Sequence, residues 1–207
     1  MPGRDPNQRR LIALEAARLI SEHGIRDYQA AKRKAAVHLG VRDTSALPKN
    51  DEIDAALREH QRLFHGLEQP RVLRTLRLAA CEAMHYLARF QPRLVGPVLE
   101  GTADANSAVC LHLFCESPES VIDQLRDDRI MFTENDRRLR LDSQRSANFP
   151  VLRLRQANVD FDLTLLPTDA IRQAPLGRSG EQSLQRASLA QVQALCETSD
   201  QRVAIGE

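Results

Sequence analysis

The chain has 207 residues, a net charge of +1 at pH 7, 42% hydrophobic residues and 28% charged residues. These values are typical of a globular protein with one sizeable domain or two smaller ones. They exclude a strong global attraction to nucleic acid, and no apolar run approaches the ~18 residues that a membrane span needs. The polar start, MPGRDPNQRR, lacks the apolar stretch of a secretory signal, so we expect a cytoplasmic protein with no membrane partner.

The first ninety residues have the pattern of helices. Apolar residues at helical spacing over 7–23 predict a first helix. Its expected buried face carries Leu11, Leu14, Ala17, Leu19 and Ile20. Asp27 is a candidate N-cap for a second helix over 27–39, a third helix is expected over 50–63, and a fourth, rich in Ala and Leu, over 70–90.

A basic triplet, Lys32, Arg33 and Lys34, lies in the second of these helices. Its cations could contact phosphates, and the surrounding stretch resembles the start of TetR-type helix-turn-helix regulators. A recognition helix should follow Val41, where Pro48 instead indicates a loop. A nucleic-acid-binding surface and an ordinary solvated helix face therefore remain alternatives for this triplet.

After Pro92 the pattern changes to that of strands. The expected strands are LVGPVL, AVCLHLF, IMFTE, RRLRLDS, FPVLRLRQ and VDFDLTLLP. Helices are expected to begin at Ser117, with Pro118 in the first helical position, and at Ser188. We therefore expect an α+β protein, with a helical region over 1–90 and an α+β domain over 91–207.

One stretch of this second region, VGPVLEGTADANSAVCLHLF, combines a loop of small residues with a following strand. Small residues let backbone N–H groups approach a triphosphate without obstruction, and the strand projects alternate side chains toward the same place. The candidate nucleotide-binding residues are Gly96, Gly101, Thr102 and Ser107.

Over residues 85–166 the chain resembles the polymerase-beta-type nucleotidyltransferase superfamily, whose small bacterial members carry G-S-x-x-x-G-T-A followed by S-D-h-D, where h is apolar. Gly96 matches the first glycine, Gly101, Thr102 and Ala103 match G-T-A, and Ser107 matches the serine before the first aspartate. The resemblance implies a mixed sheet with flanking helices, a nucleoside triphosphate as partner and, if catalysis is retained, Mg²⁺ as cofactor.

The metal-binding positions of that pattern fall on residues that suit Mg²⁺ poorly. The two aspartates would stand at Ala108 and Cys110, and Pro97 replaces the loop serine. Only Asp160 or Asp162 remains for the third carboxylate, and one carboxylate cannot hold two Mg²⁺ ions. We therefore expect a nucleotidyltransferase fold that has lost two-metal catalysis and acts by binding a nucleotide, an RNA or a protein.

Two alternatives stay open beside this expectation. An active nucleotidyltransferase could use non-standard carboxylates, the candidates being Asp104, Glu116, Asp160 and Asp162. A nucleic-acid-binding regulator could act through the basic N-terminal helices.

Two further pairs have competing interpretations. Cys110 and His112 share one face of the expected strand, where they could line a cleft, bind a soft metal, act as an acid–base pair or simply pack in the interior. Asp160 and Asp162 could be catalytic carboxylates, a solvated strand face, or partners of Arg153 and Arg155 in cross-strand ion pairs.

Overall fold

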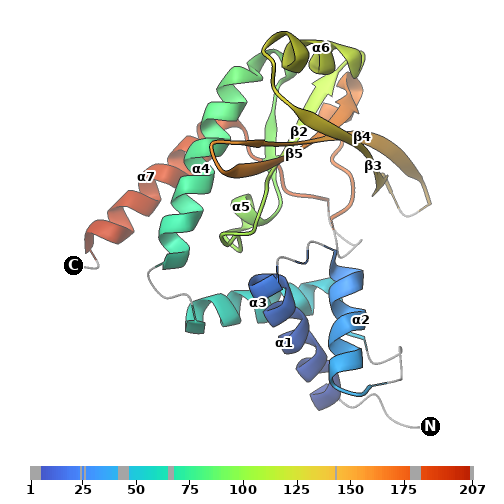
Figure 1. The fold of residues 1–207 in the computed structure, drawn as a ribbon, viewed down its shortest axis with the longest axis vertical. Helices are drawn as coiled ribbons and strands as arrows, with labels where there is room; N and C mark the ends of the chain where they lie inside the picture. Colours follow the sequence, from blue (N-terminus) through green and yellow to red (C-terminus); the bar gives the residue numbers. More distant parts are fainter. Residues whose placement is uncertain are drawn as a thin grey trace. The chain divides into compact units, whose positions relative to one another are not determined.

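The computed structural model describes residues 6–23, 25, 27–41, 47–64, 68–142, 144–177 and 183–205. These residues form the expected α+β fold, with helices in the first part and a mixed five-stranded sheet with flanking helices in the second (Figure 1). The chain divides into two compact units. The first ends at Gln69 and also includes the segment Asp104–Asn106, and the second begins at Pro70.

The first unit consists of three helices, α1 (Pro6–His23), α2 (Tyr28–His38) and α3 (Asn50–Phe64). As the sequence predicts, the Asp27 side chain caps α2 by accepting a hydrogen bond of 2.9 Å from the Gln29 backbone N–H. The Glu52 carboxylate in the first turn of α3 accepts the Lys49 backbone N–H and pairs with Arg9 of α1 at 2.6 Å.

Of the residues expected on the buried face of α1, Ala17 and Leu19 are buried and Ile20 packs against the same core, but Leu11 and Leu14 are exposed. Leu11 is 54% exposed and Leu14 is 38% exposed. The core of the unit uses a stripe of mostly smaller side chains on α1, namely Ile12, Ala13, Ala16, Ala17 and Leu19. These residues pack against buried alanines and larger apolar residues of α2 and α3, and small side chains allow such close approach of helices.

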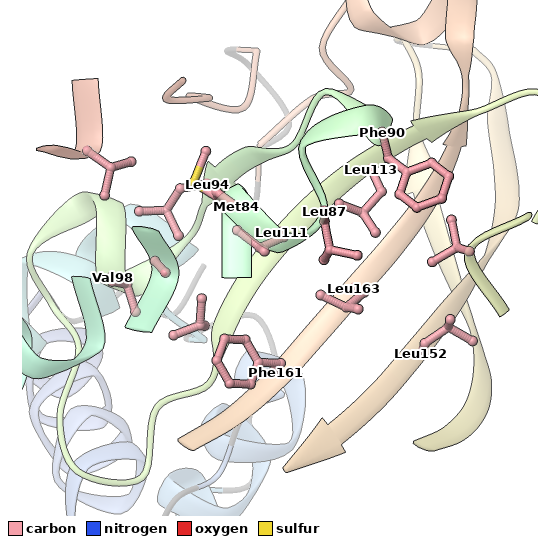
Figure 2. Packing of buried hydrophobic residues seen from close by; sticks show 14 of the residues in the cluster. Met84, Leu87, Phe90, Leu94, Val98, Leu111, Leu113, Leu152, Phe161 and Leu163 are labelled. Carbon is pink, nitrogen blue, oxygen red and sulfur yellow. The ribbon is translucent and has the colours of Figure 1, made fainter. Parts of the chain in front are cut away.

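The second unit contains all but the first two residues of α4 (Glu68–Tyr86), which is followed by a 3₁₀ turn at Ala88–Phe90. The end of this helix and the turn after it pack against the sheet. In Figure 2, Met84 and Leu87 lie beside Leu111, and Phe90 lies beside Leu113. Because α4 is part of the sheet's core, the division between units lies near residue 70, not at the end of this helix.

The sheet has the order β1-β2-β5-β4-β3, with β2 and β5 parallel and every other neighbouring pair antiparallel. Its strands are β1 (Arg93–Val95), β2 (Val109–Cys115), β3 (Phe132–Arg140), β4 (Ser146–Gln156) and β5 (Val159–Pro167). The expected strand LVGPVL was wrong in its second half, because Pro97–Glu100 is a helical turn, α5. The two expected strands IMFTE and RRLRLDS form the single strand β3.

Two other helices flank the sheet, α6 (Glu119–Asp127) and α7 (Leu189–Ile205). Ser117 does not cap α6 as expected, because its hydroxyl bonds to the Glu119 carboxylate and Pro118 is the N-cap residue. Ser188 does stabilise the start of α7, where its backbone N–H and its hydroxyl both donate to the Gln191 side-chain oxygen, at 2.8 and 3.1 Å. Among the helices described, none combines the length and the apolar character required to cross a membrane.

Alternation along the strands gives the sheet two different faces. One face carries the apolar core, with Leu111, Leu113, Leu152 and Leu163 among its residues (Figure 2). The register places Cys110, His112, Asp162 and Thr164 on the opposite face, together with Arg153 of β4. We call this second side the polar face, and it carries most of the residues that the sequence singled out.

Candidate functional site

The loop between β1 and β2 requires glycine at two positions. Gly96 has φ 71° and ψ −153°, a conformation that side-chain-bearing residues rarely adopt, and Gly101 has φ 79° in the left-handed region. A Cβ atom at Gly96 would lie 3.9 Å from Cβ and Sγ of Cys110, so the loop runs against the start of β2. Thr102 is buried and its backbone N–H bonds to the Pro97 carbonyl at 3.0 Å, whereas Ser107 is partly buried.

The parallel pairing of β2 with β5 brings the expected metal positions together. Cys110 lies directly beside Asp162 in the register, and Asp162 is 3% exposed. Ala108, immediately before β2, is also buried and contributes only a methyl group. The loop glycine, Cys110 and Asp162 therefore converge on the polar face at the start of β2.

Arginines surround the one buried carboxylate of this group. Nη2 of Arg137 lies 2.7 Å from an Asp162 oxygen, and Nε of Arg153 lies 3.5 Å from the other. Arg137 extends from β3 across β4, and its second terminal nitrogen is 3.4 Å from the Thr164 hydroxyl. Asp162 is thus not part of a solvated strand face, and its position beside two guanidinium groups differs from that of a metal ligand.

Asp160 occupies a more open position than Asp162. It pairs with Arg155 of the neighbouring strand at 3.8 Å, and both side chains are more than one-third exposed. The cross-strand ion pairs that the sequence offered as one interpretation are therefore confirmed for Asp160 with Arg155 and for Asp162 with Arg153.

His112 lies deeper on the same face and is only 2% exposed. Burial, with Arg186 and Arg137 nearby, lowers its pKa to about 3. Its imidazole is therefore neutral at physiological pH and accepts a hydrogen bond at Nδ1 from Nε of Arg186, 3.3 Å away. A base this weak is unsuited to proton transfer near neutral pH, which removes the acid–base interpretation of Cys110 and His112.

Arg186 is a partly buried cation that the sequence did not single out. Its Nη1 donates to the Ala170 carbonyl at 2.8 Å, and its guanidinium lies 5.0 Å from the centre of the Phe114 ring. Burial and the neighbouring Arg93 lower the pKa of Arg186 to about 10, so it remains a cation at neutral pH. The stretch around it has no strand or helix periodicity, so only its contacts identify it.

The charge on the polar face is predominantly positive. Its cationic side chains are Arg93, Arg137, Arg153, Arg155 and Arg186, and the strands described contribute Asp160 and Asp162 as carboxylates.

Arg186 also borders an open pocket of about 500 Å³ between α5, residues 185–187 and α7. The pocket's other lining residues are Leu99, Gln185, Ala187, Gln191, Ala194 and Leu195.

The residues of the polar face do not fit a two-metal centre. Across the described part of the chain, no three His, Cys, Asp or Glu side chains gather closely enough to hold a metal ion. At the expected position, Ala108 offers no ligand, Cys110 is a soft thiol, and Asp162 is already bound by Arg137. No step that requires Mg²⁺ follows from this arrangement.

The basic triplet of α2 does not form one exposed surface. Lys32 is 5% exposed, and burial lowers its pKa, whereas Arg33 and Lys34 are exposed. The helical pattern places Lys32 beside Ala31 and Ala35 in the buried stripe, so neither the solvated-face nor the phosphate-binding interpretation applies to all three cations.

Comparison of the chain with protein-family models, with curated proteins and with solved structures gives no match.

Proposed function

We propose that the second unit is a nucleotidyltransferase-like domain that binds the phosphates of a nucleotide through arginines, without divalent metal and without nucleotidyl transfer. The observation that carries this proposal is the environment of Asp162, the one carboxylate left at the expected metal site, which Arg137 and Arg153 engage.

The order of elements around Asp162 supports the nucleotidyltransferase-like part of the proposal. A glycine turn at Gly96 leads into β2, a helix follows, and β5 returns parallel to β2 with Asp162 beside Cys110. This is the arrangement that brings loop, first carboxylates and third carboxylate together in the superfamily that the sequence resembles.

The charge of the polar face supports the phosphate-binding part. Guanidinium groups bind phosphate oxygens through paired N–H donors, and they carry the positive charge that metal ions otherwise supply to a triphosphate. Arg137 and Arg153 share a single buried carboxylate, which leaves an excess of positive charge beside the loop. Each charge-assisted hydrogen bond to a phosphate contributes about 1.5–3 kcal/mol, or roughly tenfold or more in affinity.

Isothermal titration calorimetry with adenosine and guanosine triphosphates, first in EDTA and then in excess Mg²⁺, tests the proposal. We expect binding in EDTA that Mg²⁺ does not strengthen. We expect Arg137→Gln to weaken it about tenfold. Arg138→Gln is the matched control, because Arg138 is the exposed neighbour on the other face of β3 and should leave affinity unchanged.

A transfer assay with labelled triphosphates and Mg²⁺ or Mn²⁺ separates the alternatives. Label transferred to protein, RNA or a small acceptor, and lost in Asp162→Ala, would show an active enzyme. Affinity that requires Mg²⁺, or no triphosphate binding in either buffer, would also contradict the proposal.

A further inference from the structure

Two free cysteines face each other across a pair of packed helices in the second unit. In Figure 1, α4 and α7 lie side by side, and they run in opposite directions. Gln193 of α7 lies 3.5 Å from His85 of α4, and one helical turn away Cys196 is a close enough neighbour of Cys81 to raise the pKa of its thiol. The two contacts fix an antiparallel register in which the cysteines are opposite each other.

The surroundings of the pair hold the two sulfur atoms in place. Cys196 is 8% exposed and follows Val192 of the buried core by one turn, so it points from α7 toward the interior. Cys81 packs against the same core and is partly exposed. Arg77, one turn before Cys81, interacts electrostatically with Cys196.

We propose that Cys81 and Cys196 form a reversible disulfide when a peroxide oxidises the protein, and that this pair is a redox-modification site of the second unit. A thiolate of the pair attacks the peroxide oxygen, giving a sulfenic acid and releasing water. The second thiol then attacks that sulfur, which forms the S–S bond and releases a second water. Two thiols and one hydrogen peroxide thus give one disulfide and two waters.

The thiol environment sets the rate of this reaction. Burial and the neighbouring Cys196 raise the pKa of Cys81 to about 11. Because the thiolate is the reacting species, oxidation at neutral pH is slow compared with that of an acidic sensor cysteine. The modification therefore responds to sustained exposure to peroxide and not to a brief pulse.

The disulfide has a structural consequence for the pocket beside Arg186. Three residues of α7, Gln191, Ala194 and Leu195, line this pocket, and the bond would tie the helix that carries them to α4. It would also close a long loop of chain between positions 81 and 196, which restricts the unfolded state. We expect the midpoint of thermal unfolding to rise by roughly 5 °C or more in the oxidised protein.

Peptide mapping of the full chain tests the proposal. The protein is incubated for hours with excess hydrogen peroxide, blocked with iodoacetamide and digested with trypsin without reductant. The expected product joins LAACEAMHYLAR, which contains Cys81, to ASLAQVQALCETSDQR, which contains Cys196, and is split by a phosphine reductant. Cys110 and Cys115 share another tryptic peptide, so their oxidation gives a distinct mass.

Two variants test whether Cys196 is the partner of Cys81 in the joined peptide. Cys196→Ser should abolish the joined peptide and the rise in unfolding midpoint, whereas Cys110→Ser, the control, should retain both. Separate sulfinic acids on Cys81 and Cys196, or disulfides only between molecules, would overturn the proposal. The wild-type map alone decides between these products even if Cys196→Ser does not fold.

Discussion

Replacing Asp162 by Asn separates an arginine-based phosphate site from a metal-dependent one, because the two predict opposite effects. In a metal site the change removes a ligand and weakens triphosphate binding. In the site proposed here it removes a negative charge that competes with phosphate for Arg137 and Arg153, which lie 2.7 and 3.5 Å from the carboxylate.

The magnitude follows from Coulomb's law. A unit charge about 6 Å from a bound phosphate contributes roughly 1.4–2.8 kcal/mol at an effective dielectric constant between about 20 and 40. The lower end applies, because the Arg137 and Arg153 side chains are 31% and 49% exposed and water screens them. We therefore expect Asp162→Asn to bind triphosphate about tenfold more tightly in EDTA.

The same substitution should destabilise the free protein. Asp162 accepts a charge-assisted hydrogen bond from Arg137 and is only 5% exposed in its side chain. Losing the charge should lower the free energy of unfolding by about 1.5 kcal/mol, since solvent can replace part of the interaction at the arginines. Urea denaturation measures this loss.

The direction of the change in triphosphate affinity, and not its size, tests the arginine-based site. Calorimetry in EDTA that shows weaker or unchanged triphosphate binding by folded Asp162→Asn protein would contradict the arginine-based site. Asp136→Asn is the matched control, because Asp136 is exposed on the other face of β3 and its substitution should change neither affinity nor stability appreciably.

Two predictions concern other parts of the site. The pKa of His112 is about 3 in the folded protein and near 6.5 in the unfolded chain, so between these pH values the unfolded state binds more protons. The free energy of unfolding should therefore fall by up to about 1.4 kcal/mol for each pH unit below 6.5. His112→Gln should lack this component in urea denaturation measured from pH 7 to pH 5, and an unchanged slope would contradict it. Gly96→Ala should lower the free energy of unfolding by about 2 kcal/mol, because its backbone conformation is nearly restricted to glycine. Gly101→Asn should lower the free energy of unfolding much less, because asparagine tolerates the left-handed region. Equal losses of stability at both glycines would refute this reasoning.

Local pattern predicted the positions of most elements. The helices expected over 7–23 and 27–39 are α1 and α2 within a residue at each end, and VDFDLTLLP is β5 over its full length. Such segments combine periodicity with a cap or turn signal, which act within a few residues. The strand expected at LVGPVL was wrong in its second half, because Gly96 and Pro97 start a helical turn there. The preference of proline for the first helical position was not visible in the apolar pattern.

Burial within an element was harder to predict than its position. Leu11 and Leu14 are large and apolar, yet they are exposed, and the interior of the first unit contains Ala13 and Ala16 beside the expected Ala17. Which side of an apolar helix is buried depends on how closely its neighbours approach, and that depends on residues far away in sequence.

The alternating charges of β4 and β5 offered cross-strand ion pairs as one interpretation. The register of the folded sheet decides that Arg153 pairs with Asp162 and Arg155 with Asp160. Arg137 and Arg186 were not foreseeable in this way. Arg137 reaches Asp162 across an intervening strand, and Arg186 reaches His112 from 74 positions away. The amino-acid order thus specifies the glycine loop, the strands and the absence of carboxylates at Ala108 and Cys110, since these depend on local conformation and chemistry. The cationic character of the polar face arises only when the folded sheet brings distant arginines to one buried carboxylate.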